Sequence, residues 1–144
     1  MKEFPVRSPS EKIGGLVHFG RMLDKIRVHG RGELPAEYEP NLGKGFDAKC
    51  CAFLHIDYVE LATRVRNGAS DGEILEWAFT SGRRPSDDEI TMWNEFMRKF
   101  GWCDHAAEIL ARRKREAGMA HRAEIETMFQ FIDADEGRTV TCDV

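Results

Sequence analysis

The sequence predicts an all-α fold, a single compact domain of six or seven short helices in an orthogonal array. Three observations predict it. Apolar residues recur at helical spacing through most of the 144 residues, serine and aspartate stand at helix starts, and no stretch shows sustained strand alternation. Hydrophobic residues make up 42% of the chain, so one core is expected over residues 1–144, with a loosely held tail from about residue 137.

The first helix is expected to run from Ser8 to about His29. Ser8 takes the N-cap position, Pro9 the first helical position and Glu11 the capping-box position, and Gly30 ends the helix. One arc of about 120° on this helix is apolar and faces the core. It consists of Leu16, Phe19, Met22, Leu23 and Ile26.

Residues 31–45 interrupt the helical pattern with two prolines and three glycines, which predicts a long connection of a kind that is often functional. A second helix is expected from Asp47. A third begins at Asp57 and ends near Gly68, because Asp57 and the glutamate three residues later form a capping-box pattern.

Two similar segments predict the next two helices. Ser70 and Ser86 each stand three residues before a glutamate, and each is followed by an isoleucine and a tryptophan three residues apart. Two last helices are expected over about 105–117, capped by Asp104, and over about 121–134. The predicted core includes Leu16, Leu23, Ile26, Ile74, Trp77, Ile90, Trp93, Ile125 and Phe129.

The composition of the chain argues against several classes of protein. With 21 basic and 25 acidic residues the chain carries a net charge of −4, whereas a strongly basic domain is typical of nucleic-acid binding. No apolar run approaches the length of a membrane-spanning helix, and the first residues show no secretory signal. The four cysteines are too few for a disulfide scaffold. We therefore expect a cytoplasmic protein with no nucleic-acid partner, no membrane partner and no cofactor; a homodimer is compatible with these observations.

A cationic stripe on the first helix is the leading candidate site. His18, Arg21 and Lys25 lie within about 60° of each other on the helix wheel, and Asp24 is placed to orient Arg21 or Arg27. Arginine supplies a planar fork and lysine a point charge for an oxyanion. The leading hypothesis is a non-enzymatic binding protein that recognises a small anion or an acidic protein surface. The candidate ligand-binding residues are His18, Arg21, Asp24, Lys25, Arg27 and Tyr38.

A structural role for the same stripe is the competing interpretation, in which Arg21 and Lys25 pair with carboxylates of the 31–45 segment. The carboxylates available there are Glu33, Glu37 and Glu39. We expect this segment to fold back over the polar face of the first helix. Tyr38 would then bury its ring in a groove beside the helix, with its hydroxyl group hydrogen-bonded.

Two other function classes stay open. One is an enzyme acting on an anionic metabolite, in which His18 is the acid or base and Arg21 and Lys25 hold the substrate. The other is a metal or redox protein built on the cysteines. Its candidate metal ligands are Cys51, His55, Cys103 and His105, although no Cys-x-x-Cys spacing is present.

The chain also resembles the small bacterial domain-of-unknown-function family 5069. The resemblance covers about residues 4–132, and its most specific part is the segment from Arg21 to Arg27. It rests on Ser8-Pro9, Gly14-Gly15-Leu-Val-His18, Arg21-Met-Leu-Asp24-Lys25-Ile-Arg27, Gly32, Tyr38, Ser70-Asp71 and Trp77. The resemblance implies an intracellular, soluble helical domain and directs attention to the Arg21–Arg27 segment, but it assigns no role to any residue.

Overall fold

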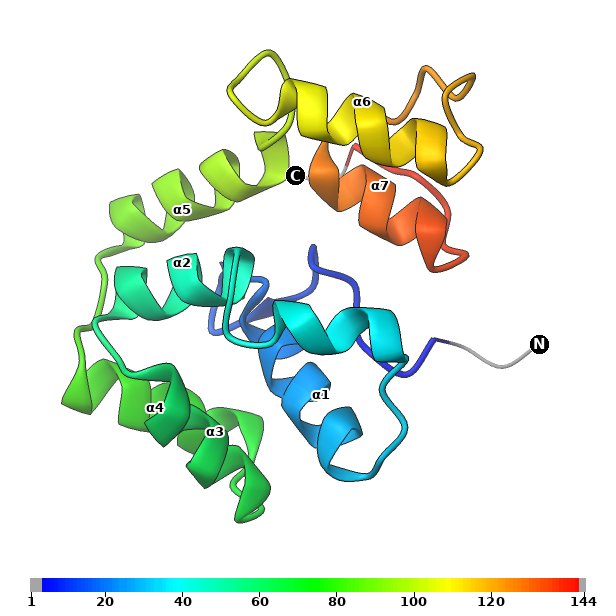
Figure 1. Cartoon of the computed structure of the whole chain (residues 1–144). Coiled ribbons are helices and arrows are strands. Elements are labelled where there is room, and N and C mark those ends of the chain that lie inside the picture. The colour runs from blue at the N-terminus through cyan, green and yellow to red at the C-terminus, as the bar shows by residue number, and fades with distance from the viewer. Residues whose placement is uncertain (1–3, 143–144) are drawn as a thin grey trace.

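The computed structural model describes residues 4–142 and confirms the predicted helical fold (Figure 1). A two-stranded antiparallel hairpin, β1 (Lys12–Ile13) and β2 (Leu16–Val17), precedes the first helix. The helices are α1 (Phe19–Gly30), the 3₁₀ helix η1 (Ala36–Asn41), α2 (Phe46–Leu54), α3 (Tyr58–Arg66), α4 (Asp71–Ser81), α5 (Asp87–Lys99), α6 (Ala107–Glu116) and α7 (Met128–Asp135). None of the helices in the described residues is long and apolar enough to cross a membrane.

The start of the first helix differs from the prediction. The chain reverses at Gly14 and Gly15, whose φ angles are 58° and 84°, so that β1 pairs with β2 and the helix begins only at Phe19. Two consecutive residues with positive φ form the turn that best matches the twist of a hairpin, and glycine adopts that conformation without a steric penalty. The predicted end at Gly30 is confirmed.

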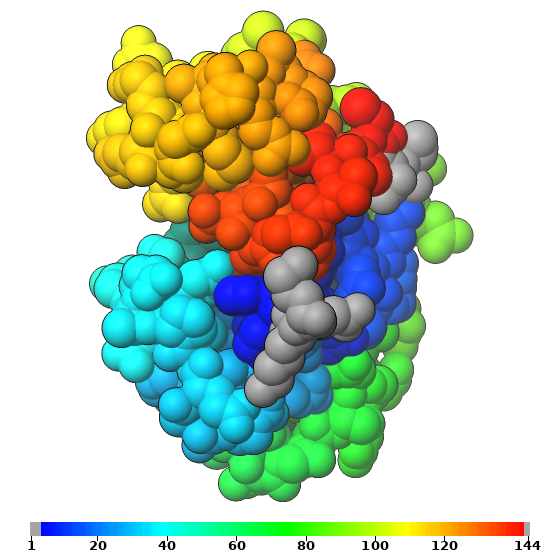
Figure 2. Space-filling model, turned by 90° about the vertical axis from the view of Figure 1, so that its right-hand side faces the viewer, coloured from blue at the N-terminus to red at the C-terminus, as the bar shows by residue number. Residues whose placement is uncertain are grey.

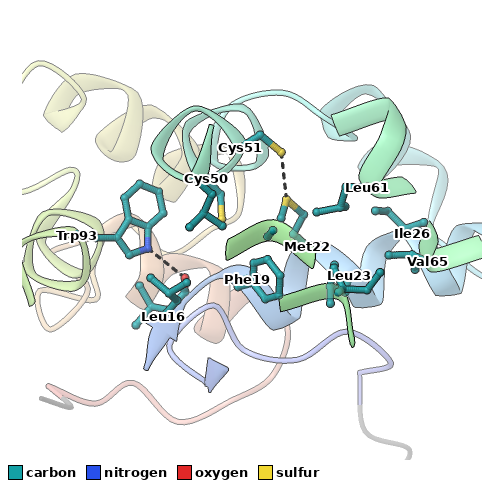
Figure 3. Packing of buried hydrophobic residues seen from close by; sticks show 14 of the residues in the cluster. Leu16, Phe19, Met22, Leu23, Ile26, Cys50, Cys51, Leu61, Val65 and Trp93 are labelled. Carbon is teal, nitrogen blue, oxygen red and sulfur yellow. Dashed lines mark hydrogen bonds between the residues drawn. The ribbon is translucent and has the colours of Figure 1, made fainter. Parts of the chain in front are cut away.

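The predicted apolar stripe is buried in the main core (Figure 3). Phe19, Met22 and the other stripe residues face Cys50 and Cys51 of α2 and apolar residues of α3, among them Leu61 and Val65. On the other side, the indole Nε1 of Trp93 in α5 donates a hydrogen bond to the carbonyl oxygen of Val17 at 3.3 Å. All the predicted core residues are buried except Trp77 and Ile90, which are half-buried at the edge of the same cluster.

α4 and α5 begin at their predicted capping signals, whereas α6 and α7 do not. Ser70 and Ser86 both form complete capping boxes, as predicted. Asp104 was expected to cap α6, but the N-cap residue is Ala106, which has no side-chain cap hydrogen bond, and the helix begins at Ala107. The carboxylate of Asp104 instead accepts hydrogen bonds from the backbone N–H groups of Gly101 and Ala106 in the turn before the helix. The last helix starts later than expected, at Met128, because Thr127 forms its capping box with Gln130.

The C-terminal helices have a second, smaller core. Leu110 of α6 packs with Ile125, Met128 and Phe131, and α6 and α7 lie side by side above α2 in Figure 1. Phe46, at the start of α2, packs against both cores. The two cores therefore meet around this one aromatic side chain.

Candidate functional site

A cleft of about 540 Å³ lies where the two cores meet. Its walls come from α1, from the end of the 31–45 segment with α2, and from α6 and α7. Figure 2 shows α6, in yellow, and α7, in orange-red, lying above the 31–45 segment, in cyan. Of the six predicted ligand-binding residues, His18, Arg21, Lys25 and Tyr38 line this cleft.

His18 is the N-cap residue of α1 and lies at the floor of the cleft, with only 2% of its surface exposed. Its φ of 70° is a left-handed conformation that few residues other than glycine adopt. The ring Nε2 lies 2.8 Å from Oδ1 of Asp47, whereas Nδ1 is buried and has no hydrogen-bond partner among the described residues. Burial lowers the pKa of His18, and the hydrogen bond with Asp47 offsets only part of that effect.

Asp47 is fully buried beneath the cleft and connects three groups. Its Oδ1 accepts from His18, and its Oδ2 accepts from Nζ of Lys25 at 2.9 Å and from the backbone N–H of Gly43 at 3.1 Å. Burial alone would raise the pKa of Asp47, but the hydrogen bond from His18 and the charge of Lys25 outweigh it and hold the pKa below its ordinary value. The triad is therefore a neutral imidazole, a carboxylate and an ammonium group, with no net charge.

Arg21 forms a second buried ion pair, with Glu136 just after α7. The guanidinium donates to both carboxylate oxygens, at 2.9 and 2.6 Å, and Glu136 has 2% of its side chain exposed. The hydroxyl of Tyr38 donates to the same carboxylate at 2.7 Å, and Arg138 donates to it as well. Burial opposes the ionisation of Glu136, but Arg21 lowers its pKa below the ordinary value.

Asp24 and Arg27 do not belong to the cleft. Asp24 accepts hydrogen bonds from Arg7, at 2.8 and 3.0 Å, instead of orienting Arg21. Arg27 lies 3.5 Å from Asp24 and donates to Asp71 at 2.7 Å, and Arg7 contacts both aspartates. This four-residue cluster connects the N-terminal segment and α1 to the start of α4.

The 31–45 segment contacts the first helix, but not through the predicted ion pairs. Tyr38 packs its ring at 5.4 Å from that of Phe4 and against the cluster that contains Val28 of α1. The expected pairing of Arg21 and Lys25 with Glu33, Glu37 or Glu39 is wrong. Both cations pair instead with Asp47 and Glu136, which are buried and therefore exclude the water that would weaken the pairs.

Several residues of the cleft were missed by sequence reasoning. Asp47 was expected only as the start of a helix, and no role was assigned to Glu136. Lys44, Lys49 and Arg113 also line the cleft, and none of them was predicted as a site residue. One feature of the sequence could have pointed to Asp47 and Glu136. The first helix carries more positive charges than carboxylates, and buried cations need carboxylate partners elsewhere in the chain.

The proposed metal ligands are not supported. Within residues 4–142, no group of three or more His, Cys, Asp or Glu side chains is placed to hold a metal ion. Cys51 is buried against Met22, with 3.9 Å between the two sulfur atoms, whereas Cys103 is exposed. Burial raises the pKa of the Cys51 thiol to about 12, so it stays protonated and unreactive at neutral pH.

A family model described as a domain of unknown function, DUF5069, matches residues 3–138 of the 144-residue chain. The chain belongs to this family. The match spans both sides of the cleft, from the N-terminal segment through α7 to Arg138. Comparison of this DUF5069 domain with curated proteins found no match.

Below about pH 6.5 the DUF5069 domain is expected to lose stability as the pH falls. Because burial lowers the pKa of His18, the unfolded chain takes up a proton that the native state excludes, and falling pH then favours unfolding. Asp47 and Glu136, whose pKa values are lowered, add a second loss below about pH 4.

Urea unfolding between pH 8 and pH 5 measures this dependence. The slope approaches at most about 1.4 kcal/mol per pH unit, the limit for one proton. His18→Asn, which keeps a side chain that tolerates the left-handed conformation, should flatten the profile in this range. A wild-type stability that does not change between pH 8 and pH 5 would show that His18 is not buried in its neutral form.

Proposed function

We propose that this protein binds a small organic anion in the cleft, as a binding protein rather than an enzyme. One observation supports the proposal most directly: three further cations, Lys44, Lys49 and Arg113, line the same cleft, and none of them forms a salt bridge with a described carboxylate. All three residues are exposed. Lys49 also lies over the ring of Phe100 at 5.6 Å, and Arg113 interacts electrostatically with Asp135, so part of this charge is compensated within the cleft and the rest is available to a ligand from solution.

The cations of α1 have a different role in this proposal. Arg21 and Lys25 are already neutralised by Glu136 and Asp47, so they contribute little net attraction at the mouth of the cleft. They fix the shape of its floor and hold donor groups in place. The outer cations supply the attraction, which is screened by salt because they face solvent.

The apolar part of the cleft supports an organic ligand. Phe46 and Phe100 meet edge to face at 5.3 Å, and Phe131 and Ile132 of α7 also line the cleft. The volume of about 540 Å³ is in the range of small-molecule sites, which combine apolar walls with a few polar groups. An anion with an aromatic or aliphatic body satisfies both features.

A triple variant tests this proposal. Lys44→Gln, Lys49→Gln and Arg113→Gln together remove the outer cations. The matched control combines Lys12→Gln, Arg66→Gln and Arg115→Gln. These substitutions lower the net charge by the same amount, but they replace exposed basic residues outside the cleft. Isothermal titration with mandelate, phenylacetate, phenyl phosphate and phenyl sulfate compares the three proteins.

The wild type and the control are expected to bind at least one of these anions, and the cleft variant to bind it at least about tenfold more weakly, since two or three charge-assisted contacts are lost. Raising the salt concentration should weaken wild-type binding and leave the residual binding of the cleft variant almost unchanged. Equal affinities in the cleft variant and the control would overturn the proposed site.

The His18–Asp47 pair favours a second candidate function, an enzyme acting on an anionic metabolite with His18 as acid or base. An imidazole held by a carboxylate at one nitrogen and free at the other has the arrangement of a general base. Proton NMR of the titration samples after prolonged incubation distinguishes the two functions. If the wild-type protein consumes a bound anion and His18→Asn does not, the protein is an enzyme rather than a binding protein.

A further inference from the structure

We infer that the ligand of this cleft presents an O–H group to Nδ1 of His18, in addition to the anionic group held by the outer cations. The inference rests on the proposed function and names its ligand class: an oxyanion that also carries a hydroxyl group, such as a 2-hydroxy acid or a phosphate monoester that keeps one proton. It is carried by the buried, unpartnered Nδ1 of His18, a residue that lines the cleft.

The hydrogen bonds of His18 fix which nitrogen carries the proton. Asp47 is an ionised carboxylate that can only accept, so the ring proton is on Nε2 and Nδ1 presents a lone pair. Burial keeps the ring neutral, which leaves Nδ1 an acceptor that cannot donate. Phe46, whose ring lies edge-on to the imidazole with 5.6 Å between the ring centroids, has no polar side-chain group to offer His18.

The stability of the fold does not explain why His18 has an unpartnered nitrogen and a left-handed backbone conformation. A buried acceptor without a partner destabilises the native state, and so does a non-glycine residue at φ 70°. Both unfavourable features belong to the same residue, and that residue lines the cleft. Strained or unsatisfied groups of this kind are found at sites where a ligand completes the structure.

An acceptor at this position discriminates between anions. A carboxylate or sulfate oxygen placed at Nδ1 would oppose one lone pair with another, whereas a hydroxyl group would donate a hydrogen bond. Nδ1 is covered by protein atoms, so a ligand hydroxyl group reaches it only when the side chains that cover it at the cleft move aside. Mandelate and phenylacetate differ by one hydroxyl group and share the ring and the carboxylate, and phenyl phosphate and phenyl sulfate are a second matched pair.

Isothermal titration of the wild-type protein at pH 6 with the two pairs tests the inference. Mandelate is expected to bind about tenfold more tightly than phenylacetate, the effect of one buried hydrogen bond. Phenyl phosphate, which keeps its second proton in part at this pH, should likewise be preferred to phenyl sulfate. A preference within only one pair identifies the source of the hydroxyl group, a hydroxy acid or a phosphate ester.

His18→Gly removes the acceptor and tolerates the left-handed conformation, so it should reduce the affinity for mandelate to that for phenylacetate and leave the phenylacetate affinity within about twofold. His29→Gly, on the same helix but outside the cleft, is the matched control and should keep the preference. The ¹⁵N resonance of Nδ1 in the wild type gives a measurement that does not depend on a variant that folds. It should move on addition of mandelate and stay in place with phenylacetate.

Equal affinities within both pairs, or an Nδ1 resonance that does not respond to mandelate, would overturn the inference and leave the proposed anion site intact. Binding of none of the four anions would overturn both, because the inference requires the outer cations to hold an anion. Retention of the preference in His18→Gly, which has no side-chain acceptor, would show that another group accepts the hydroxyl proton.

Discussion

Replacing Asp47 with alanine is expected to lower the free energy of unfolding by about 3–5 kcal/mol, the range for breaking a buried ion pair by removing one partner. Asp47 is fully buried, and its carboxylate accepts hydrogen bonds from His18, from Lys25 and from the backbone N–H of Gly43. Without Asp47, the ammonium group of Lys25 has no carboxylate partner. The Lys25 side chain is only 8% exposed, so water does not replace that partner. Chemical denaturation followed by circular dichroism measures the loss.

Two comparisons identify the cause of that loss. Asp88→Ala removes an exposed aspartate in the first turn of α5 and should cost less than about 1 kcal/mol, the size of a helix-dipole interaction. Adding Lys25→Met to Asp47→Ala should restore part of the stability, because the unpaired charge is removed while its volume is kept. A double variant as unstable as the sum of the single variants would show that the buried cation is not the source of the cost.

The parts of the fold that were predicted correctly depend on local signals. The capping boxes at Ser70 and Ser86 act within four residues, and the apolar stripe of α1 needs only helical spacing. The start of α1 was predicted incorrectly because contacts distant in sequence decide it. Asn94 of α5 accepts from the backbone N–H of Val17 and donates to the carbonyl oxygen of Gly15, which fixes the hairpin.

The site was only half predictable for the same reason. His18, Arg21 and Lys25 could be placed on one face from their spacing alone, but the partner of His18 lies 29 residues away at Asp47, and the partner of Arg21 lies 115 residues away at Glu136. The nearer carboxylates, Glu33 and Glu37, were the obvious choice in sequence. Both are exposed, however, and an exposed ion pair stabilises a fold only slightly because water and salt screen it.

Arg21→Ala is expected to lower the free energy of unfolding by about 1–3 kcal/mol. The effect is smaller than that of Asp47→Ala because Glu136 retains hydrogen bonds from Tyr38 and Arg138. Arg21 also donates to the carbonyl oxygen of Arg7, so the variant leaves that acceptor with one donor fewer as well. Urea unfolding gives the total loss, with Arg31→Ala as the control. Arg31 forms only an exposed pair with Glu33 and should change stability by less than about 0.5 kcal/mol.

The loss caused by Arg21→Ala should be unevenly distributed, because Arg21 connects α1 of the main core to the end of α7 in the smaller core. Native-state hydrogen exchange should show faster exchange of the α7 amides, while α1 and α3 in the main core keep their protection. Exchange that accelerates equally in all helices would mean that the two cores unfold as one unit. Glu136 would then stabilise the whole domain rather than hold the C-terminal helices across the cleft.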